Sequence, residues 1–123
     1  MKIIVAGGCN GWCVENLPLA SAELYDPATD TWTKLPDMPY PIHSSKMEQV
    51  NGYPTIIGGV TEDFTKESNV ARTGILQSYD PDENQWFVPK MATENKDGSL
   101  IIPRSSHAVI QVPKHLVANC IYS

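Results

Sequence analysis

The chain lacks any run of basic residues. Nine of its 123 residues are Lys or Arg and fourteen are Asp or Glu, which gives a formal net charge of -5. Nucleic-acid affinity comes largely from clustered cations that neutralise phosphates. The chain also lacks an apolar run near the roughly 20 residues of a membrane span, and Ile3–Ala6 is too short for a secretory signal core. We therefore expect no nucleic-acid partner and no membrane partner.

The chain has only three cysteines, Cys9, Cys13 and Cys120, which is an odd number. Three cysteines cannot all pair within one chain, and such a count fits a reducing compartment better than a disulfide framework. Cys9 and Cys13 stand four apart, but no second Cys or His pair stands at metal-ligand spacing. The sequence thus predicts free thiols, no metal site and a cytoplasmic location.

A catalytic constellation is missing as well. There is no Gly-x-Ser-x-Gly turn for a nucleophile, and Gly7–Gly11 does not fit the dinucleotide pattern Gly-x-Gly-x-x-Gly, since Pro18 interrupts the helix that should follow. The histidines are dispersed, and the acidic residues in expected loops are interpreted as solvated charges. These residues are His43, His107, His115, Glu62, Asp63, Glu67, Asp82 and Glu83. We predict no catalytic residues, no cofactor and no enzyme activity.

Turn-forming residues are plentiful, with ten Pro and eight Gly, and they favour an all-β chain. Comparison of the sequence with itself then shows a unit of about fifty residues that occurs twice. The pair Gly7-Gly8 returns as Gly58-Gly59, displaced by 51, and each pair follows a β-branched apolar run. Two further matches are displaced by 54: Tyr25-Asp26-Pro27 with Tyr79-Asp80-Pro81, and Trp32 with Trp86.

A third segment repeats beyond these residues. Pro41–Val50 aligns with Pro103–Val112, displaced by 62. The displacement grows by three after the second Gly pair and by eight after Trp86, where the polar stretch Thr93–Leu100 contains a turn-forming Asp-Gly. The spacing from Tyr to Trp is seven in both units. Homologous units with variable loops account for this pattern.

Each unit predicts short strands. The run before the Gly pair is typical of a strand, Ala22–Tyr25 and Thr31–Leu35 predict a hairpin, and the segment ending at Val50 or Val112 supplies a further strand. That gives four strands per unit. Paired glycines permit positive φ and close approach of a neighbouring backbone, and each Tyr and Trp can fill the space between stacked sheets.

This combination of Gly-Gly, Tyr-Asp-Pro and a Trp seven residues after the Tyr resembles the kelch repeat. The resemblance covers Ile3 to about Val117 and implies that each unit is one four-stranded blade of a β-propeller. It assigns a structural role to the signature residues Gly7, Gly8, Tyr25, Trp32, Gly58, Gly59, Tyr79 and Trp86.

The resemblance divides the chain into a partial repeat over 1–40, a complete repeat over 41–91, and a linker with the start of a degenerate third repeat over 92–123, where Ala118-Asn119-Cys120 replaces the Gly pair. Complete kelch propellers have five to seven blades, so about two blades cannot close a ring. Three alternatives stay open: a fragment, a degenerate copy, or a chain that completes itself by self-association.

The resemblance also implies a function. Kelch propellers are more commonly binding platforms for a protein or peptide than enzymes, and their pocket is lined by the loop after the Gly pair and by the start of the post-proline strand. By position, the expected partner-binding residues are Asn10, Trp12, Ser44, Phe64, Arg72, Arg104 and Ser106. Trp12 either packs back on its blade or anchors a partner.

The sequence favours a non-catalytic protein-binding scaffold. It would serve as the substrate-recognition part of a cullin ubiquitin ligase adaptor, which needs an additional BTB-type domain. The alternatives are an actin-associated structural protein and a fragment of a propeller enzyme of the oxidase or epimerase type.

Overall fold

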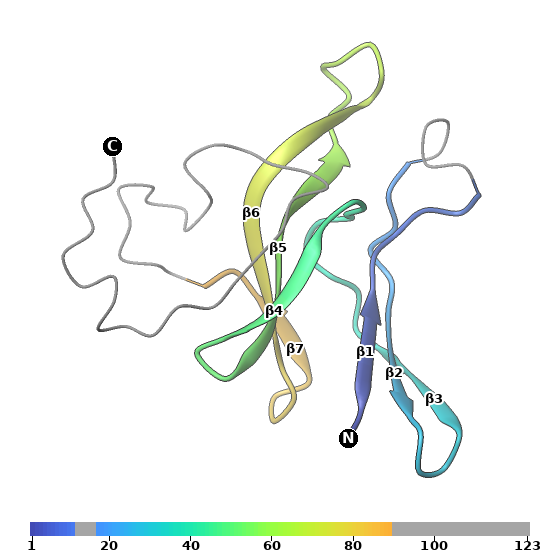
Figure 1. Ribbon diagram of the computed structural model, residues 1–123. Coiled ribbons are helices and arrows are strands. Elements are labelled where there is room, and N and C mark those ends of the chain that lie inside the picture. The colour runs from blue at the N-terminus through green and yellow to red at the C-terminus, as the bar shows by residue number, and fades with distance from the viewer. Residues whose placement is uncertain (12–16, 90–123) are drawn as a thin grey trace, which may run out of the picture.

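The structure is a computed structural model that describes residues 1–11 and 17–89. Its described residues form two antiparallel sheets (Figure 1). The first has the order β1-β2-β3 and the second the order β4-β5-β6-β7. The strands are β1 Ile3–Ala6, β2 Ala22–Asp26, β3 Thr31–Leu35, β4 Lys46–Val50, β5 Tyr53–Glu62, β6 Val70–Asp80 and β7 Gln85–Phe87. The prediction of an all-β fold is confirmed, with no helix in the described ranges, but β5 and β6, of 10 and 11 residues, are longer than the short strands that the sequence predicted.

The constant spacing between Tyr and Trp has a simple structural cause. In each unit the two residues face each other across a hairpin, with Tyr25 opposite Trp32 and Tyr79 opposite Trp86. Their rings are in contact, with centroids 4.7 Å apart in the first unit and 5.3 Å apart in the second. A change in turn length would shift the strands against each other and break this pairing, so the spacing is fixed by the register.

The Gly pairs do not occupy the same position in the two units. β1 ends at Ala6, directly before Gly7, as the sequence predicted. β5 instead continues through its Gly pair to Glu62, and its register against β6 shifts between Ile57 and Gly59. Such a bulge lets a strand bend without ending. The Gly pair thus follows the strand in the first unit but lies within the strand in the second.

The core lies between the two sheets. It takes residues from β2 and β3 of the first sheet, from β5, β6 and β7 of the second, and from the segment between the sheets. The cluster contains Ala22, Leu35, Met38, Ile42, Ile56, Tyr79 and Trp86. Ile42 is fully buried, and Ile56 is 1% exposed. Met38 and Ile42 come from the segment that joins the two sheets, so this segment is itself part of the core.

We define residues 36–45 as the linker. Hydrogen bonds hold it from both sheets, as a buried backbone requires. On the side of the first sheet, the carbonyl of Ile42 accepts from Gly8 N at 2.7 Å, and Met38 N donates to Ala20 O at 2.8 Å. On the side of the second sheet, Trp86 Nε1 donates to Pro36 O at 2.9 Å, and Tyr40 N donates to Gln77 Oε1 at 2.9 Å.

The close approach of backbone at a Gly pair is confirmed at two positions. A Cβ at Gly7 would collide with the carbonyl oxygen of Ile42, and one at Gly59 would stand 2.7 Å from the carbonyl oxygen of His43. Both glycines also have positive φ, of 73° and 113°. The first Gly of one pair and the second Gly of the other therefore make room for the linker.

Gly7 and Gly8 provide a matched test of this packing. Both have positive φ, but a Cβ at Gly8 would have no neighbour within 4 Å. We expect Gly8→Ala to lower the free energy of unfolding by about 1–2 kcal/mol through backbone strain alone. Gly7→Ala adds a steric clash with backbone, and overpacking of this kind costs a further ~1–3 kcal/mol. Urea denaturation of the two variants measures the difference, and equal losses would contradict the packing at Gly7.

Candidate partner-binding surface

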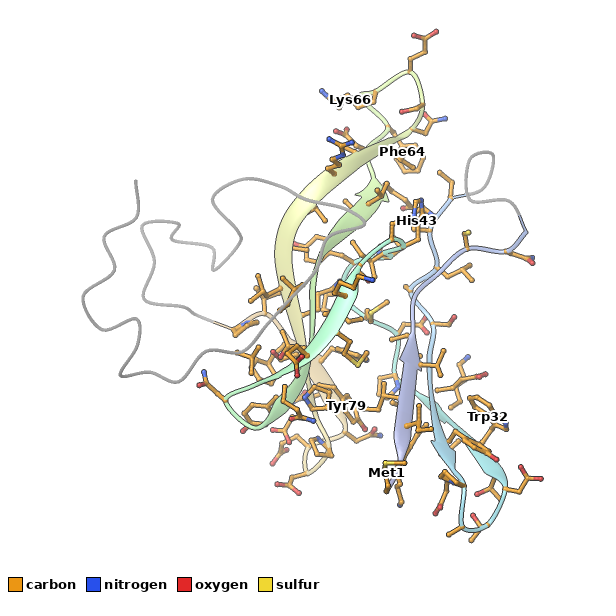
Figure 2. The ribbon with its side chains drawn as sticks, in the orientation of Figure 1. Met1, Trp32, His43, Phe64, Lys66 and Tyr79 are labelled. Carbon is orange, nitrogen blue, oxygen red and sulfur yellow. The ribbon has the colours of Figure 1, made fainter. Side chains whose placement is uncertain are left out.

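Three segments far apart in the sequence lie at one end of the molecule. They are residues 7–11, residues 43–45 and the β5–β6 loop over residues 63–69. Figure 2 shows His43, Phe64 and Lys66 at this end and Tyr79, Trp32 and Met1 toward the other. We call it the loop end. Backbone hydrogen bonds attach the linker to residues 7–11 and to β5, because Gly8 N donates to Ile42 O at 2.7 Å and His43 pairs with Val60 through two bonds of 3.0 and 2.8 Å.

The β5–β6 loop is built around Asp63. The side-chain oxygen Oδ1 accepts from the backbone N of Thr65 at 3.0 Å and from its hydroxyl. The backbone N of Asp63 donates to Asn69 O at 2.8 Å, and Asn69 N donates to Lys66 O at 3.0 Å. Asn69 has a φ of 60°, a conformation that Asn tolerates better than most residues. The loop is thus ordered by its own hydrogen bonds.

Phe64 is displayed at the start of this loop, and 68% of its surface is exposed. The residues on either side of it in sequence, Asp63 and Thr65, are fixed by hydrogen bonds to each other. An aromatic side chain held on an ordered loop loses little conformational entropy when it binds a partner. Phe64 can therefore act as an apolar anchor.

Arg72 and His43 lie on one row across the second sheet. Arg72 of β6 is paired with Val60 of β5, and Val60 is paired with His43 in the linker. Adjacent strands are about 4.8 Å apart, so Arg72 and His43 are separated by roughly twice that distance. Ser44 follows His43, has a φ of 54° and is exposed, as is Arg72. The guanidinium and the hydroxyl can therefore both face a ligand at the loop end.

The side chain of His43 contacts the hydroxyl of Ser44. Its ring is 8% exposed, and Nδ1 is 2.8 Å from Ser44 Oγ. The other ring nitrogen, Nε2, is buried without a hydrogen-bond partner. The contact with Nδ1 fixes the direction of the Ser44 hydroxyl, which the sequence did not predict.

Four of the seven predicted partner-binding residues are described by the structure. Asn10, Ser44, Phe64 and Arg72 are all exposed, and they come from the three segments of the loop end or from the strand directly after them. Trp12, Arg104 and Ser106 lie outside the described residues, as do His107 and His115. The acidic residues are divided: Glu62, Asp63 and Glu67 are near the loop end, whereas Asp82 and Glu83 are in the β6–β7 turn.

No group of three or more His, Cys, Asp or Glu within residues 1–11 and 17–89 is arranged to hold a metal ion. Over the same ranges, no helix is long and apolar enough to cross a membrane. Cys9 is disulfide-bonded. The sequence prediction of a free thiol is therefore wrong for Cys9, because an odd number of cysteines leaves at least one unpaired but does not exclude one bond.

The Tyr-Asp-Pro motif has a second role at the opposite end, which the sequence did not predict. Tyr25 Oη donates to Asp30 Oδ1 at 2.8 Å, and Tyr79 Oη donates to Asn84 Oδ1 at 2.6 Å, in each case five residues onward. The carboxylates that follow the tyrosines, Asp26 and Asp80, accept from backbone N two residues later. Asp30 and Asn84 both have positive φ, near 50°. The motif therefore closes the turn that sets the register of the hairpin.

A family model described as the Kelch motif matches residues 2–39, which contain the first Gly pair, the first Tyr-Asp-Pro and Trp32. This part of the chain carries a kelch repeat. The second kelch unit is established by its repeat of these residues and by its equivalent hairpin, with Tyr79 opposite Trp86.

Two curated relatives show the extent of this similarity. Alpha-scruin from Limulus polyphemus is 33% identical over 69 residues, which are 56% of this chain and 8% of that protein. A protein named "Kelch repeat and BTB domain-containing protein 2", from Ectromelia virus, is 47% identical over 60 residues, which are 49% of this chain and 10% of that protein. The chain spans a tenth or less of the length of either relative.

The solved structure titled "Structure of YjhT" is similar in fold. It superposes with a TM-score of 0.54 and 22% identity, covering 71% of this chain and 34% of that one. At this identity the likeness concerns the fold alone. Together with the kelch motif it shows that the two sheets are blades of a kelch-type β-propeller, with three strands described in the first blade and four in the second.

Asp63 offers a test of the loop geometry. The hydroxyl and backbone N of Thr65 hold the pKa of the Asp63 carboxyl below its ordinary value, with a smaller contribution from Lys66. A carboxyl with a lowered pKa stabilises the folded loop above its ordinary pKa of about 3.9, and this contribution is lost as the pH falls through the lowered value. We expect Thr65→Val to raise the pKa of Asp63 in an NMR titration. An unchanged pKa would contradict the hydroxyl contact.

Proposed function

We propose that this kelch-repeat chain is part of a non-catalytic scaffold that binds a protein or peptide at its loop end. The observation that carries the proposal is Phe64, an exposed aromatic side chain on a loop fixed by hydrogen bonds. Exposed aromatics of this kind commonly dominate the binding energy of protein interfaces. Asn10, Ser44 and Arg72 supply polar groups around it.

The partner would offer an apolar side chain beside an acidic group. Phe64 supplies apolar area, and Arg72 supplies a planar guanidinium suited to a carboxylate. Ser44 adds one adaptable hydrogen bond at the edge, oriented by His43. An extended peptide segment can meet all three groups, because the row from Arg72 to His43 crosses the sheet over two strand spacings.

We further propose that the scaffold acts as the substrate-recognition part of a ubiquitin ligase adaptor. The support is that one curated relative carries a BTB domain in its name, since an adaptor of this kind needs a BTB-type domain in addition to kelch repeats. Binding of a cullin by the full-length protein is the test. Absence of such binding, with partner binding at the loop end intact, would remove the adaptor role and leave the scaffold.

A cytoplasmic location stays a prediction. It rested on the odd number of cysteines, and the disulfide at Cys9 argues against it, because disulfides are rare in reducing compartments. Alkylation of thiols in freshly isolated protein, followed by mass spectrometry, measures the state of Cys9 in its own compartment.

The central prediction concerns Phe64. A peptide selected from a random library against the immobilised chain serves as the probe, and isothermal titration measures its Kd. We expect Phe64→Ala to weaken binding by about 30-fold, which corresponds to the loss of ~2 kcal/mol that defines an interface hot spot. The matched control is Glu83→Ala in the β6–β7 turn at the other end, which leaves the Kd unchanged.

The opposite pattern decides against the proposal. If the selected peptides bind Phe64→Ala and Arg72→Ala as tightly as the parent chain, the loop end is not the binding surface. A loss of the same size in Glu83→Ala would indicate a general effect on folding, and circular dichroism of each variant distinguishes that case.

A further inference from the structure

The backbone at Ser44 is held in an unfavourable conformation from both sides. Ser44 has a φ of 54°, in the left-handed region that few residues other than glycine adopt. On one side, His43 pairs with Val60 through two backbone hydrogen bonds. On the other side, Ser45 lies so close to Gly59 that a Cβ at Gly59 would stand 2.9 Å from the Ser45 Cβ. Such conformations persist where the surrounding structure fixes them, and they cluster at ligand sites.

The two ring nitrogens of His43 have different surroundings. His43 lies at the loop end (Figure 2) and is 8% exposed. Its Nδ1 is 2.8 Å from Ser44 Oγ, and the tautomer of the ring decides which of these two atoms donates. Its Nε2 is buried and has no hydrogen-bond partner among the described residues. One nitrogen therefore has a hydroxyl that can either accept or donate, and the other has nothing.

This difference indicates where the ring carries its proton. A neutral imidazole has one N–H and one bare nitrogen, and a charged imidazole has two N–H groups. Both the Nε2–H tautomer and the charged ring would place an N–H without an acceptor at the buried nitrogen. Buried N–H groups without an acceptor are rarer in proteins than acceptors without a donor. The Nδ1–H tautomer is the one form of the ring that avoids an unpaired N–H at Nε2.

The tautomer of His43 determines what the Ser44 hydroxyl offers to a partner. In the Nδ1–H form, the ring donates and Ser44 Oγ accepts, so the hydroxyl proton of Ser44 is left for another acceptor. Ser44 is exposed, and this proton can therefore reach a bound molecule. In the opposite tautomer, Nδ1 would take the hydroxyl proton, and only lone pairs would face a partner.

We propose that His43 is a positioning residue that makes Ser44 a hydrogen-bond donor, and that the group of the partner facing Ser44 is an oxygen acceptor, either a carboxylate or a backbone carbonyl. This inference rests on the proposed binding of a protein or peptide at the loop end, and it narrows the role of Ser44 from an adaptable hydrogen bond to a donated one. Arg72 also only donates. Both polar side chains therefore select oxygen atoms of the partner and disfavour an ammonium group or an amide N–H.

The tautomer is measured in the free protein, without a partner. The full chain is labelled with 15N-histidine and kept about two pH units above the ordinary imidazole pKa of about 6.5. Two-bond 1H–15N NMR correlation then distinguishes a protonated ring nitrogen from a bare one, and the His43 signals are those that disappear in His43→Asn. We expect a protonated Nδ1 and a bare Nε2. A protonated Nε2, or averaging over both nitrogens, would overturn the proposal.

Two amide variants distinguish positioning of Ser44 from packing of the ring. The side-chain amide of Asn reaches about as far as Nδ1 of His, whereas that of Gln reaches about as far as Nε2. His43→Asn can therefore still donate to Ser44 Oγ, and His43→Gln cannot. For the library-selected peptide, we expect His43→Gln and Ser44→Ala each to raise the Kd about tenfold, as the loss of one hydrogen bond predicts. His43→Asn is expected to stay within about threefold of the parent chain.

The double variant shows whether the two residues act through one interaction. His43→Gln combined with Ser44→Ala is expected to raise the Kd no further than either change alone, because both remove the same donated hydrogen bond. Circular dichroism checks that each variant is folded. Equal losses in His43→Asn and His43→Gln, or additive losses in the double variant, would overturn the positioning role of His43.

Phe64→Ala distinguishes failure of this inference from failure of the proposed function. If Phe64→Ala weakens binding of the peptide and Ser44→Ala leaves the Kd unchanged, the loop end binds the peptide but Ser44 does not donate to it, and only the inference is overturned. If neither variant changes the Kd, the proposed function is overturned as well.

Alanine substitutions in the selected peptide identify the source of the acceptor oxygen. Each acidic residue of the peptide is replaced in turn, and binding is measured to the parent chain and to Ser44→Ala. If Ser44 donates to a carboxylate, one replacement weakens binding to the parent chain but not to Ser44→Ala. If Ser44 donates to a backbone carbonyl, every replacement has the same effect on both chains. Either result, together with the tenfold loss in Ser44→Ala, supports an oxygen acceptor, and the absence of that loss overturns it.

Discussion

The fold depends on how the linker, residues 36–45, satisfies its backbone hydrogen bonds where it passes between two sheets and buries Met38, Ile42 and His43. A buried carbonyl or amide without a partner costs about 1–3 kcal/mol, so each sheet must supply partners. The first sheet does so through Gly8 N, and the second through the Trp86 indole and the Gln77 amide. The glycines at positions 7 and 59 are required because any side chain there would occupy the space of the linker.

The same constraint explains the difference between the two tryptophans. Both stand opposite a tyrosine, but Trp86 is 9% exposed and bonds to the linker, whereas Trp32 is 57% exposed. The difference lies in the neighbour, because the Trp86 indole donates to Pro36 O in the linker that follows the first blade.

Much of this arrangement could be predicted from the sequence. Equal Tyr-to-Trp spacing predicted the paired hairpins, and the Gly pairs predicted close backbone contacts, because both depend on local geometry that a repeat displays twice. The bulge in β5 could not be predicted, since a Gly pair permits either a strand end or a bend. The contact of Gln77 with Tyr40 N and the pairing of His43 with Val60 also lay beyond the sequence, because they join residues that no shared motif connects.

For the candidate site, too, some features could be predicted from the sequence and others could not. Position within the repeat selected Asn10, Ser44, Phe64 and Arg72, and all four are exposed. The hydrogen bonds of Asp63 that fix the loop carrying Phe64 were not predicted, because this loop is where the two units differ in length. The disulfide at Cys9 was missed because counting cysteines gives only the parity of the free thiols.

Amide hydrogen exchange in the linker tests the central claim most directly. The amides of Tyr40, Ile42 and His43 donate to Gln77 Oε1, Leu19 O and Val60 O respectively, whereas the amide of Ala28 bonds within an exposed turn. If the linker joins the two blades into one unit, the three linker amides exchange only through global unfolding and share one free energy of opening. Exchange of the linker amides as fast as that of Ala28 would contradict the account.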